Sequence, residues 1–439
     1  MKRIILPVLL TFIVTLSFGQ DLKKAKSYSD AKQLDKAKTE IDAYLAKKPD
    51  DAEANYLKSK IYEQIASDST GKFKSLVSGD AHAEAFDAFK KAVADSNDVK
   101  VKLMVMKDNY QPIFGVYQGY YEQAAKAFND AAIAQNKQGF ADAMNLFIKA
   151  NNTGQYIAAN KWANIGKVDT TLVLNIGKAA LNAGKAYDDT ALKYFTQMAD
   201  AHIKGLHSTT DAGFEIPYQW LTLHYKDAKN ESNMLKYSGL GKELFPKEDY
   251  FDFVLMDYYR EKKDFPPLFK KYEDLLARNP DSLHYHFNYA NEIFGYLYNS
   301  DEGTVVSNKE NLLKTLKGEL DKSMAINPND INTNWLYAQY YYNLGIQNRD
   351  DALKIKSAKP EDARKKTELN TEAKSNFNAA IPYGEKAVSL VETGYKKSEK
   401  SKFKSINNLM QNIYQSLEQK DKTKAYQDKY DQADAKFVN

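Results

Sequence analysis

The residue types that most often carry chemistry are present in this chain, but their spacing matches no known catalytic motif. His284 and His286 are two residues apart, so on a helix they point to different faces and are poorly placed to bind one metal ion. The run YSGLG at 237–241 is near the G-x-S-x-G turn of serine hydrolases, but Lys236 occupies the first glycine position. The acidic run NSDEG at 299–303 lacks the length and alternating oxygen ligands of a calcium loop. We therefore predict no catalytic residue, no metal site and no cofactor.

Carboxylates are abundant, so a pair of acids acting on a glycan is an alternative that the sequence leaves open. Such a site needs two carboxyl groups facing each other at about 5–10 Å. Helical arrays with aromatic grooves do occur in enzymes that cleave polysaccharides. The chain has only three tryptophans for strong sugar stacking, Trp162, Trp220 and Trp335, and they lie far apart in the sequence. A glycan-binding or glycan-processing protein is thus the second hypothesis.

The overall charge argues against a nucleic-acid partner. Lys plus Arg number 62 and Asp plus Glu number 58, which gives a formal net charge of only +4. Only five of the basic residues are arginine, the usual bidentate reader of phosphate and guanine. The absence of cysteine excludes disulfides, thiolate metal sites and a cysteine nucleophile.

The first twenty residues predict export. Lys2 and Arg3 precede an apolar run from Ile4 to about Leu16, and the small residues Ser17 and Gly19 follow it. This order is that of a secretory leader, and cleavage after Gly19 would leave Gln20 at the new N-terminus. A permanent membrane anchor is the alternative, although the run is shorter than the ~20 residues that a spanning helix needs. No later stretch is long and apolar enough to span, so we expect a soluble mature protein outside the cytoplasm.

The elements that would position any site are short helices in pairs. From Tyr250 to Arg260, apolar residues recur three and four apart, which is the spacing of one helix face. Asp264 can then cap a second helix, and the two prolines at 266–267 suit its first turn. Its apolar face continues to Leu276, and Asn279-Pro280 ends it. The stretch 249–282 therefore predicts two antiparallel helices that must stack on similar pairs to bury their apolar faces.

The same pattern recurs along the chain. Second helices of the predicted pairs lie at 36–51, 84–98, 140–152, 192–200 and 316–330, and first helices at 54–64, 217–227, 286–296 and 334–345. We count about eight units and a closing pair. The last helix, from Lys422 to about Lys436, is polar on most faces, as a terminal cap must be.

These units resemble the tetratricopeptide repeat. The family pattern of small and aromatic positions is matched at Ala338 and Tyr341 in a first helix, and at Ala85, Phe89 and Ala92 and again Ala143, Phe147 and Ala150 in second helices. The unit at 249–282 departs from it, with Met256 at a small position and Leu268 at an alanine position. The resemblance implies an all-α, right-handed superhelical solenoid of antiparallel helix pairs that binds proteins without catalysis.

The chain also resembles secreted, many-repeat proteins of Gram-negative envelopes, whose next-to-last unit carries a long polar insertion between its helices. The matching segment is 346–374, with a turn expected at Lys359-Pro360. This likeness implies a periplasmic or secreted scaffold whose partners are envelope proteins. The predicted organisation is a signal peptide at 1–19, N-terminal repeats at 20–98, an extra helix or hinge at 99–117, and a main array at 118–439.

The tetratricopeptide geometry also implies which side chains face the concave groove. First helices line that groove, and it suits an extended peptide or a helix of a partner. The Lys/Asn clamp that some family members use for a terminal carboxylate is not matched. The candidate groove residues are Tyr250, Phe253, Asp257 and Arg260 in one unit, His284, Phe287 and Asn291 in the next, and Trp335, Gln339 and Tyr342 in the third.

Overall fold

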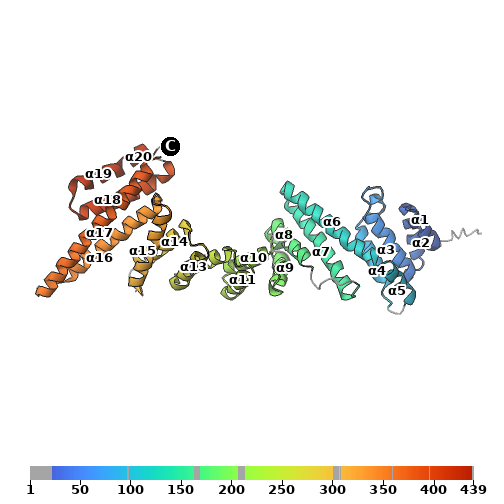
Figure 1. Cartoon of the computed structure of the whole chain (residues 1–439). Coiled ribbons are helices and arrows are strands. Elements are labelled where there is room, and N and C mark those ends of the chain that lie inside the picture. Colours follow the sequence, from blue (N-terminus) through green and yellow to red (C-terminus); the bar gives the residue numbers. More distant parts are fainter. Residues whose placement is uncertain are drawn as a thin grey trace, which may run out of the picture. The chain divides into compact units, whose positions relative to one another are not determined.

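The protein is built from helices throughout its described part. The computed structural model describes residues 22–95, 98–162, 169–205, 213–299, 306, 308–357, 359–394 and 396–437. These residues form twenty α-helices, three short 3-10 helices and no strand (Figure 1). The predicted all-α class is confirmed. None of the described helices combines the length and apolar composition that a membrane span needs, and the predicted signal peptide lies outside the described residues.

The chain divides into two compact units, 1–251 and 252–439, which are described separately. Unit 1 contains five pairs of consecutive helices that pack on each other, plus the single helix α5. The pairs are α1 (Leu22–Asp30) with α2 (Leu34–Leu45), α3 (Ala52–Ala66) with α4 (Ala81–Ala92), α6 (Gln111–Ala134) with α7 (Lys137–Ala159), α8 (Thr170–Ala183) with α9 (Asp188–Asp200), and α10 (Ile216–Asp227) with α11 (Glu231–Leu244).

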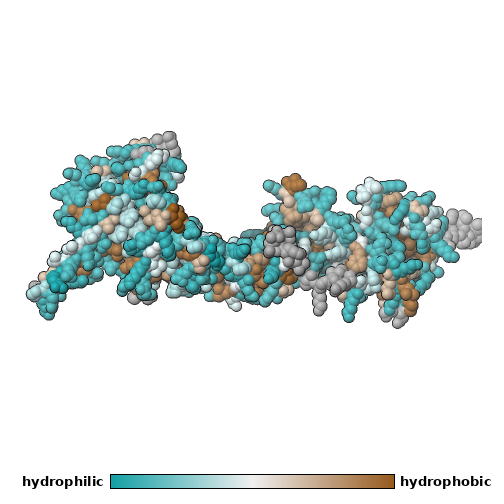
Figure 2. Space-filling view, in the orientation of Figure 1, coloured by the Kyte–Doolittle hydropathy of each residue, from teal (hydrophilic) through white to brown (hydrophobic). Residues whose placement is uncertain are grey.

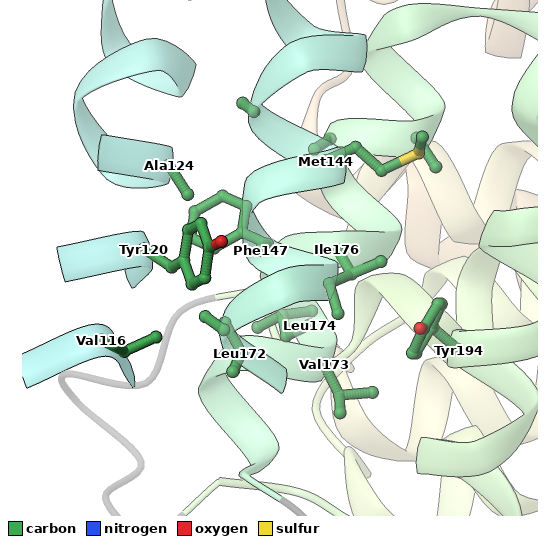
Figure 3. Packing of buried hydrophobic residues seen from close by; sticks show 14 of the residues in the cluster. Val116, Tyr120, Ala124, Met144, Phe147, Leu172, Val173, Leu174, Ile176 and Tyr194 are labelled. Atoms are coloured by element: carbon green, nitrogen blue, oxygen red, sulfur yellow. The ribbon is translucent and has the colours of Figure 1, made fainter. Parts of the chain in front are cut away.

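The core of unit 1 is continuous across these pairs because each helix presents one apolar stripe to its neighbours. Figure 3 shows part of it, where Tyr120 of α6, Phe147 of α7 and Ile176 of α8 lie close together. The helix-period pattern at 140–152 and 192–200 therefore predicted real elements, which the structure extends to whole helices.

Unit 2 repeats the arrangement. Its first pair is the main part of α12 (Tyr250–Glu261) with α13 (Phe265–Arg278), and the division between the units falls inside α12. The others are α14 (Leu283–Tyr298) with α15 (Lys309–Ile326), α16 (Ile331–Lys354) with α17 (Pro360–Glu392), and α18 (Lys400–Ser416) with α19 (Lys420–Asp431), followed by the short α20 (Ala433–Lys436). With unit 1 this makes nine pairs in the described residues, which agrees with eight units and a closing pair.

The local signals at 249–282 act as expected, with one exception. Pro266 and Pro267 lie in the first turn of α13, where an amide hydrogen is not needed, and Met256 and Leu268 are buried. Asp264 stands at the N-cap position, but its side chain makes no capping hydrogen bond, so its predicted role as a cap is wrong. The two prolines leave fewer amide hydrogens for such a cap to accept.

The two predicted interruptions have different structures. Within 99–117, the short helix α5 (Val99–Lys107) packs through buried Val101 and Val105, and α6 begins at Gln111. The polar insertion at 346–374 consists of helix extensions, since α16 runs to Lys354 and α17 starts at Pro360. The division between the compact units lies at 251/252, far from 99–117.

Tyrosine hydroxyls join successive pairs. Tyr62 of α3 donates to both carboxylate oxygens of Asp42 on α2, at 2.9 and 2.8 Å. Tyr414 of α18 donates to Glu385 of α17 at 2.7 Å. In each case the tyrosine lies on the first helix of one pair, and the carboxylate lies on the second helix of the pair before it or at the cap of that helix. Three further bonds of this kind run from Tyr120 to Asp80, from Tyr289 to Glu273 and from Tyr337 to Asp321. These bonds account for part of the unusual content of 31 tyrosines.

Candidate functional site

The predicted groove residues on α12 and α14 form one partly exposed face of unit 2. Phe253 is 41% exposed, and its ring lies 6.1 Å from that of Tyr285 on α14. Arg260 bonds both Asp257 on its own helix, at 2.6 Å, and Glu292 on α14, also at 2.6 Å. The guanidinium is therefore already paired, and Phe253 is an exposed apolar side chain that this face offers to a partner.

The remaining candidates on α14 differ in accessibility. His284 is exposed and accepts a hydrogen bond from the Asn288 amide at 2.9 Å, and Asn291 is exposed. Phe287 is half-buried and packs against the core of unit 2. Its side chain therefore contributes to the packing of the core in addition to any contact with a partner.

The candidates on α16 and the first turn of α12 mainly pack. Trp335 and Tyr342 are half-buried against the C-terminal cluster, where the Tyr342 ring lies 5.8 Å from Phe377 of α17, and Gln339 is half-buried. Tyr250 packs against the core of unit 1. The structure therefore brings the accessible candidates together only on α12 and α14.

The histidine pair and the tryptophans have structural partners. The ring of buried His286 contacts Glu319 through Nδ1, and its Nε2 lies 2.7 Å from the Pro280 carbonyl oxygen. Trp162 stacks on Tyr110, and Trp220 stacks on His224. No observation on these rings favours a sugar platform, and the described residues hold no group of three or more side chains placed to bind a metal ion.

Unit 1 contains a concave pocket that sequence reasoning missed. It has a volume of about 780 Å³ and lies between α1, α3, α5 and the start of α6. Each helix contributes residues three, four or seven apart, which is one face of a helix. The lining includes Lys23, Lys26 and Asp30 of α1, Lys32 of the turn between α1 and α2, Glu53, Tyr56, Leu57 and Lys60 of α3, and Lys100, Met104, Lys107 and Asp108 of α5 and its cap.

Six lysines and three carboxylates line this pocket, so its formal charge is +3. The carboxylates are engaged within the protein: Asp30 with Lys26 at 2.7 Å, Asp108 with Lys60 at 2.7 Å, and Glu53 with Lys100. Burial alone would raise the pKa of Asp108, but the bonds from Lys60 and Tyr56 outweigh it and hold that pKa below its ordinary value. The pocket is hereafter called the lysine pocket.

A sequence signal for the lysine pocket exists, although it is weak. Lys23 and Lys26 lie on one face of the first helix, and Lys100 and Lys107 lie seven apart on another. A lysine every three to seven residues is common on solvated helices, so only the packing of three such helices around one hollow distinguishes these positions.

Comparisons with known proteins show a distant likeness to helical-repeat structures. No protein-family model and no curated protein matches the chain. A monomeric mutant of IFIT1 with m7Gppp-AAAA is 14% identical over 86% of this chain and 69% of that one, with a TM-score of 0.28. The human IFIT1 dimer with PPP-AAAA is 14% identical over 89% of this chain and 95% of that one, with a TM-score of 0.22. Yeast Tom70 is 11% identical over 95% of this chain and 90% of that one, with a TM-score of 0.22. All three TM-scores are below 0.5, so the likeness is distant.

Proposed function

We propose that this protein is a non-catalytic interaction scaffold, and that its lysine pocket binds an acidic segment of a partner protein. The observation that carries the proposal is a concave, lysine-rich surface built by the faces of several helices. Helix pairs of this kind offer a long surface to an extended or helical segment. Ammonium groups form charge-assisted hydrogen bonds with carboxylates, which are stronger than neutral ones.

The lining of the lysine pocket favours a peptide over a nucleic acid. Asp30 and Glu53 interrupt the lysines, so the pocket does not form the continuous basic groove that follows a nucleic-acid backbone. Tyr56, its aromatic lining residue, is only 1% exposed and cannot offer a stacking face to a base. The apolar lining residues Leu57 and Met104 can contact apolar side chains between the acidic ones of a peptide.

A direct binding experiment tests this function. Fluorescence anisotropy would compare a labelled octaglutamate peptide with octalysine and glycine-serine peptides of equal length. We expect the octaglutamate peptide alone to bind, and to bind more weakly as the salt concentration rises. No binding of octaglutamate at low salt would overturn the proposal.

The chain offers a matched pair of lysines for this assay. Lys26 lines the pocket and pairs with Asp30 four residues later, at 2.7 Å. Lys126 lies on α6, does not line the pocket, and pairs with Asp130 in the same way at 2.6 Å. Lys26→Glu should weaken octaglutamate binding about tenfold, or ~1.4 kcal/mol, whereas Lys126→Glu should leave it unchanged. Equal losses in both variants would show that binding follows total charge.

A second binding surface of the same scaffold is the α12–α14 face of unit 2, where Phe253 is exposed. Crosslinking of tagged protein in intact cells, followed by mass spectrometry, should yield a partner set that Phe253→Ala loses. Leu353→Ala is the control, because Leu353 is also exposed in unit 2, on α16. If Phe253→Ala captures the same partners as Leu353→Ala, the α12–α14 face is not a binding surface. Phe287→Ala is avoided because Phe287 packs against the core.

The scaffold is further proposed to act outside the cytoplasm, as a periplasmic or secreted protein with envelope partners. The support is the leader pattern at 1–19. Intact-mass analysis of protein from the periplasmic fraction should give a chain that begins at Gln20. A full-length chain recovered from the membrane fraction would instead identify the leader as an anchor.

A further inference from the structure

Helix α5 exposes a line of apolar side chains on its outer side. Val101 and Val105 are each 2% exposed and hold the helix against unit 1. On the other side, Val99 is 66% exposed, Leu103 61% and Met106 57%. Successive residues turn by about 100°, so these three lie within one stripe that points away from the two buried valines. The stripe is hereafter called the α5 ridge.

The α5 ridge differs from the other exposed apolar residues of the described chain. Six more helices expose a large apolar side chain, and each exposes only one. Single exposed apolar residues are ordinary, whereas a contiguous group marks a contact surface. Figure 2 shows hydrophobic side chains gathered over α5 on a surface of unit 1 that is otherwise largely hydrophilic.

The charges beside the α5 ridge restrict what can cover it. Lys100 and Lys107 lie on one flank of the stripe and Lys102 on the other, as their positions on the helix require. A second copy of the chain meeting ridge to ridge would bring these lysines together, which like charges oppose. The flanks favour an occupant that carries both apolar groups and negative charge.

The α5 ridge is also continuous with the lysine pocket. Lys100, Lys107 and Met104 line the pocket, and the first two of them form the near flank of the ridge. A flat lipid surface can touch a protruding helix but cannot enter the hollow beside it. A polypeptide can fill the hollow and continue over the helix.

We infer that the α5 ridge extends the lysine pocket into one composite site, whose ligand is a protein segment with an acidic block next to an apolar helical turn. The ridge residues are spaced four and three apart over about 10 Å, which matches side chains one turn apart on a partner helix. This inference rests on the proposed function, because the acidic block is the part that the pocket binds.

A peptide-by-variant experiment tests the composite site in the full chain. The first probe is octaglutamate. The second joins octaglutamate through Gly-Ser to the apolar turn Leu-Ala-Ala-Leu-Leu-Ala-Ala-Leu, made in both block orders. Anisotropy is measured on the wild type, on Leu103→Ser with Met106→Ser, and on Ile133→Ser. Ile133 is the control because it is 86% exposed but stands alone on α6.

The expected pattern is specific to the α5 ridge. At least one block order of the joined probe should bind the wild type about tenfold more tightly than octaglutamate. The double variant should lose that gain and keep its octaglutamate affinity, and Ile133→Ser should keep both. Circular dichroism of the double variant should match the wild type, since both side chains are exposed.

The outcomes separate the two proposals. If octaglutamate binds and the joined probes bind no more tightly, the ridge inference fails and the pocket stands. If octaglutamate does not bind at all, the proposed function itself fails. Tighter binding that survives in the double variant also overturns the ridge. Ridge-dependent sedimentation with vesicles of 70:30 phosphatidylcholine to phosphatidylglycerol, without a gain from the joined probes, would show that the occupant is a lipid surface.

Discussion

Removal of one tyrosine hydroxyl tests whether these bonds hold neighbouring helix pairs together. Tyr62→Phe keeps the buried ring, which is 4% exposed as a residue, and deletes only the oxygen that bonds both carboxylate oxygens of Asp42 at 2.9 and 2.8 Å. The bond joins α3 to α2 and so connects the second helix pair to the first. The variant therefore removes a link between pairs without making a cavity the size of a side chain.

The structure sets the size of the expected loss. A hydrogen bond to a charged group contributes roughly 1.5–3 kcal/mol. Asp42 is about one-third exposed and keeps its ion pair with Lys38 at 2.8 Å, so its carboxylate is not left unsatisfied. We therefore expect the lower end of that range, about 1.5 kcal/mol. The local opening constant of α2 and α3 should rise about tenfold.

Hydrogen exchange read by mass spectrometry measures this change where it occurs. Peptides from α2 and α3 should exchange about tenfold faster in Tyr62→Phe, while peptides from α18 and α19 should be unchanged. The matched control is Tyr28→Phe, because the half-buried Tyr28 makes no hydrogen bond through its hydroxyl within the described part of the chain. In an Asp42→Asn background, the effect of Tyr62→Phe should shrink. Equal effects of Tyr62→Phe and Tyr28→Phe would refute the reasoning.

Two further predictions concern pH and packing. Burial raises the pKa of many tyrosines in the folded chain, and the rise is largest for eleven of them, most of which also lie near a carboxylate. These eleven hold their protons more tightly than in the unfolded chain, where tyrosine titrates near 10. Their contribution to stability is complete below about pH 10 and is lost as the pH rises, so the midpoint temperature of unfolding should fall above that pH. Absorbance at 295 nm should show that these phenols ionise only when the protein unfolds. Titration of all 31 tyrosines before unfolding would contradict this prediction. The eleven are Tyr56, Tyr62, Tyr117, Tyr120, Tyr218, Tyr272, Tyr289, Tyr298, Tyr337, Tyr414 and Tyr426. Gly177→Ala should destabilise the protein by about 1–3 kcal/mol because the new methyl group overlaps the Phe195 ring. Gly239→Ala, whose methyl group meets no atom within 4 Å, should instead stabilise α11 by up to about 1 kcal/mol. Thermal unfolding compares the two variants, and equal shifts in the unfolding temperature would show that the α8–α9 contact is loose.

The helices were predictable because each unit carries its own local signals. Apolar spacing fixes the buried face of α12 and α13, and Pro266 and Pro267 fix where α13 begins. The Lys359-Pro360 turn was likewise placed correctly between α16 and α17. These signals act over a few residues and do not depend on how distant segments pack.

The accessibility of the candidate site depended on contacts that sequence spacing does not contain. Phe253 and Phe287 occupy comparable positions on first helices, yet Phe253 is exposed and Phe287 packs. Trp335 and Tyr342 are covered because the C-terminal cluster lies against α16. Helix periodicity gives the face of a residue but not which neighbouring helix covers that face.

The lysine pocket shows how a nearly neutral chain can present a charged site. The net charge is only +4, but carboxylates near the pocket are directed to the protein's own hydroxyl and ammonium groups. Asp108 accepts bonds from Tyr56 and Lys60, and Asp42, on the neighbouring α2, accepts from Tyr62. The tyrosine bonds that join the helix pairs thus engage negative charge inside the structure, while the lysines of the first helices and α5 face the hollow. In this arrangement selectivity for an acidic partner comes from where the charges lie, so substitutions that leave the net charge constant but move one lysine out of the pocket should weaken binding.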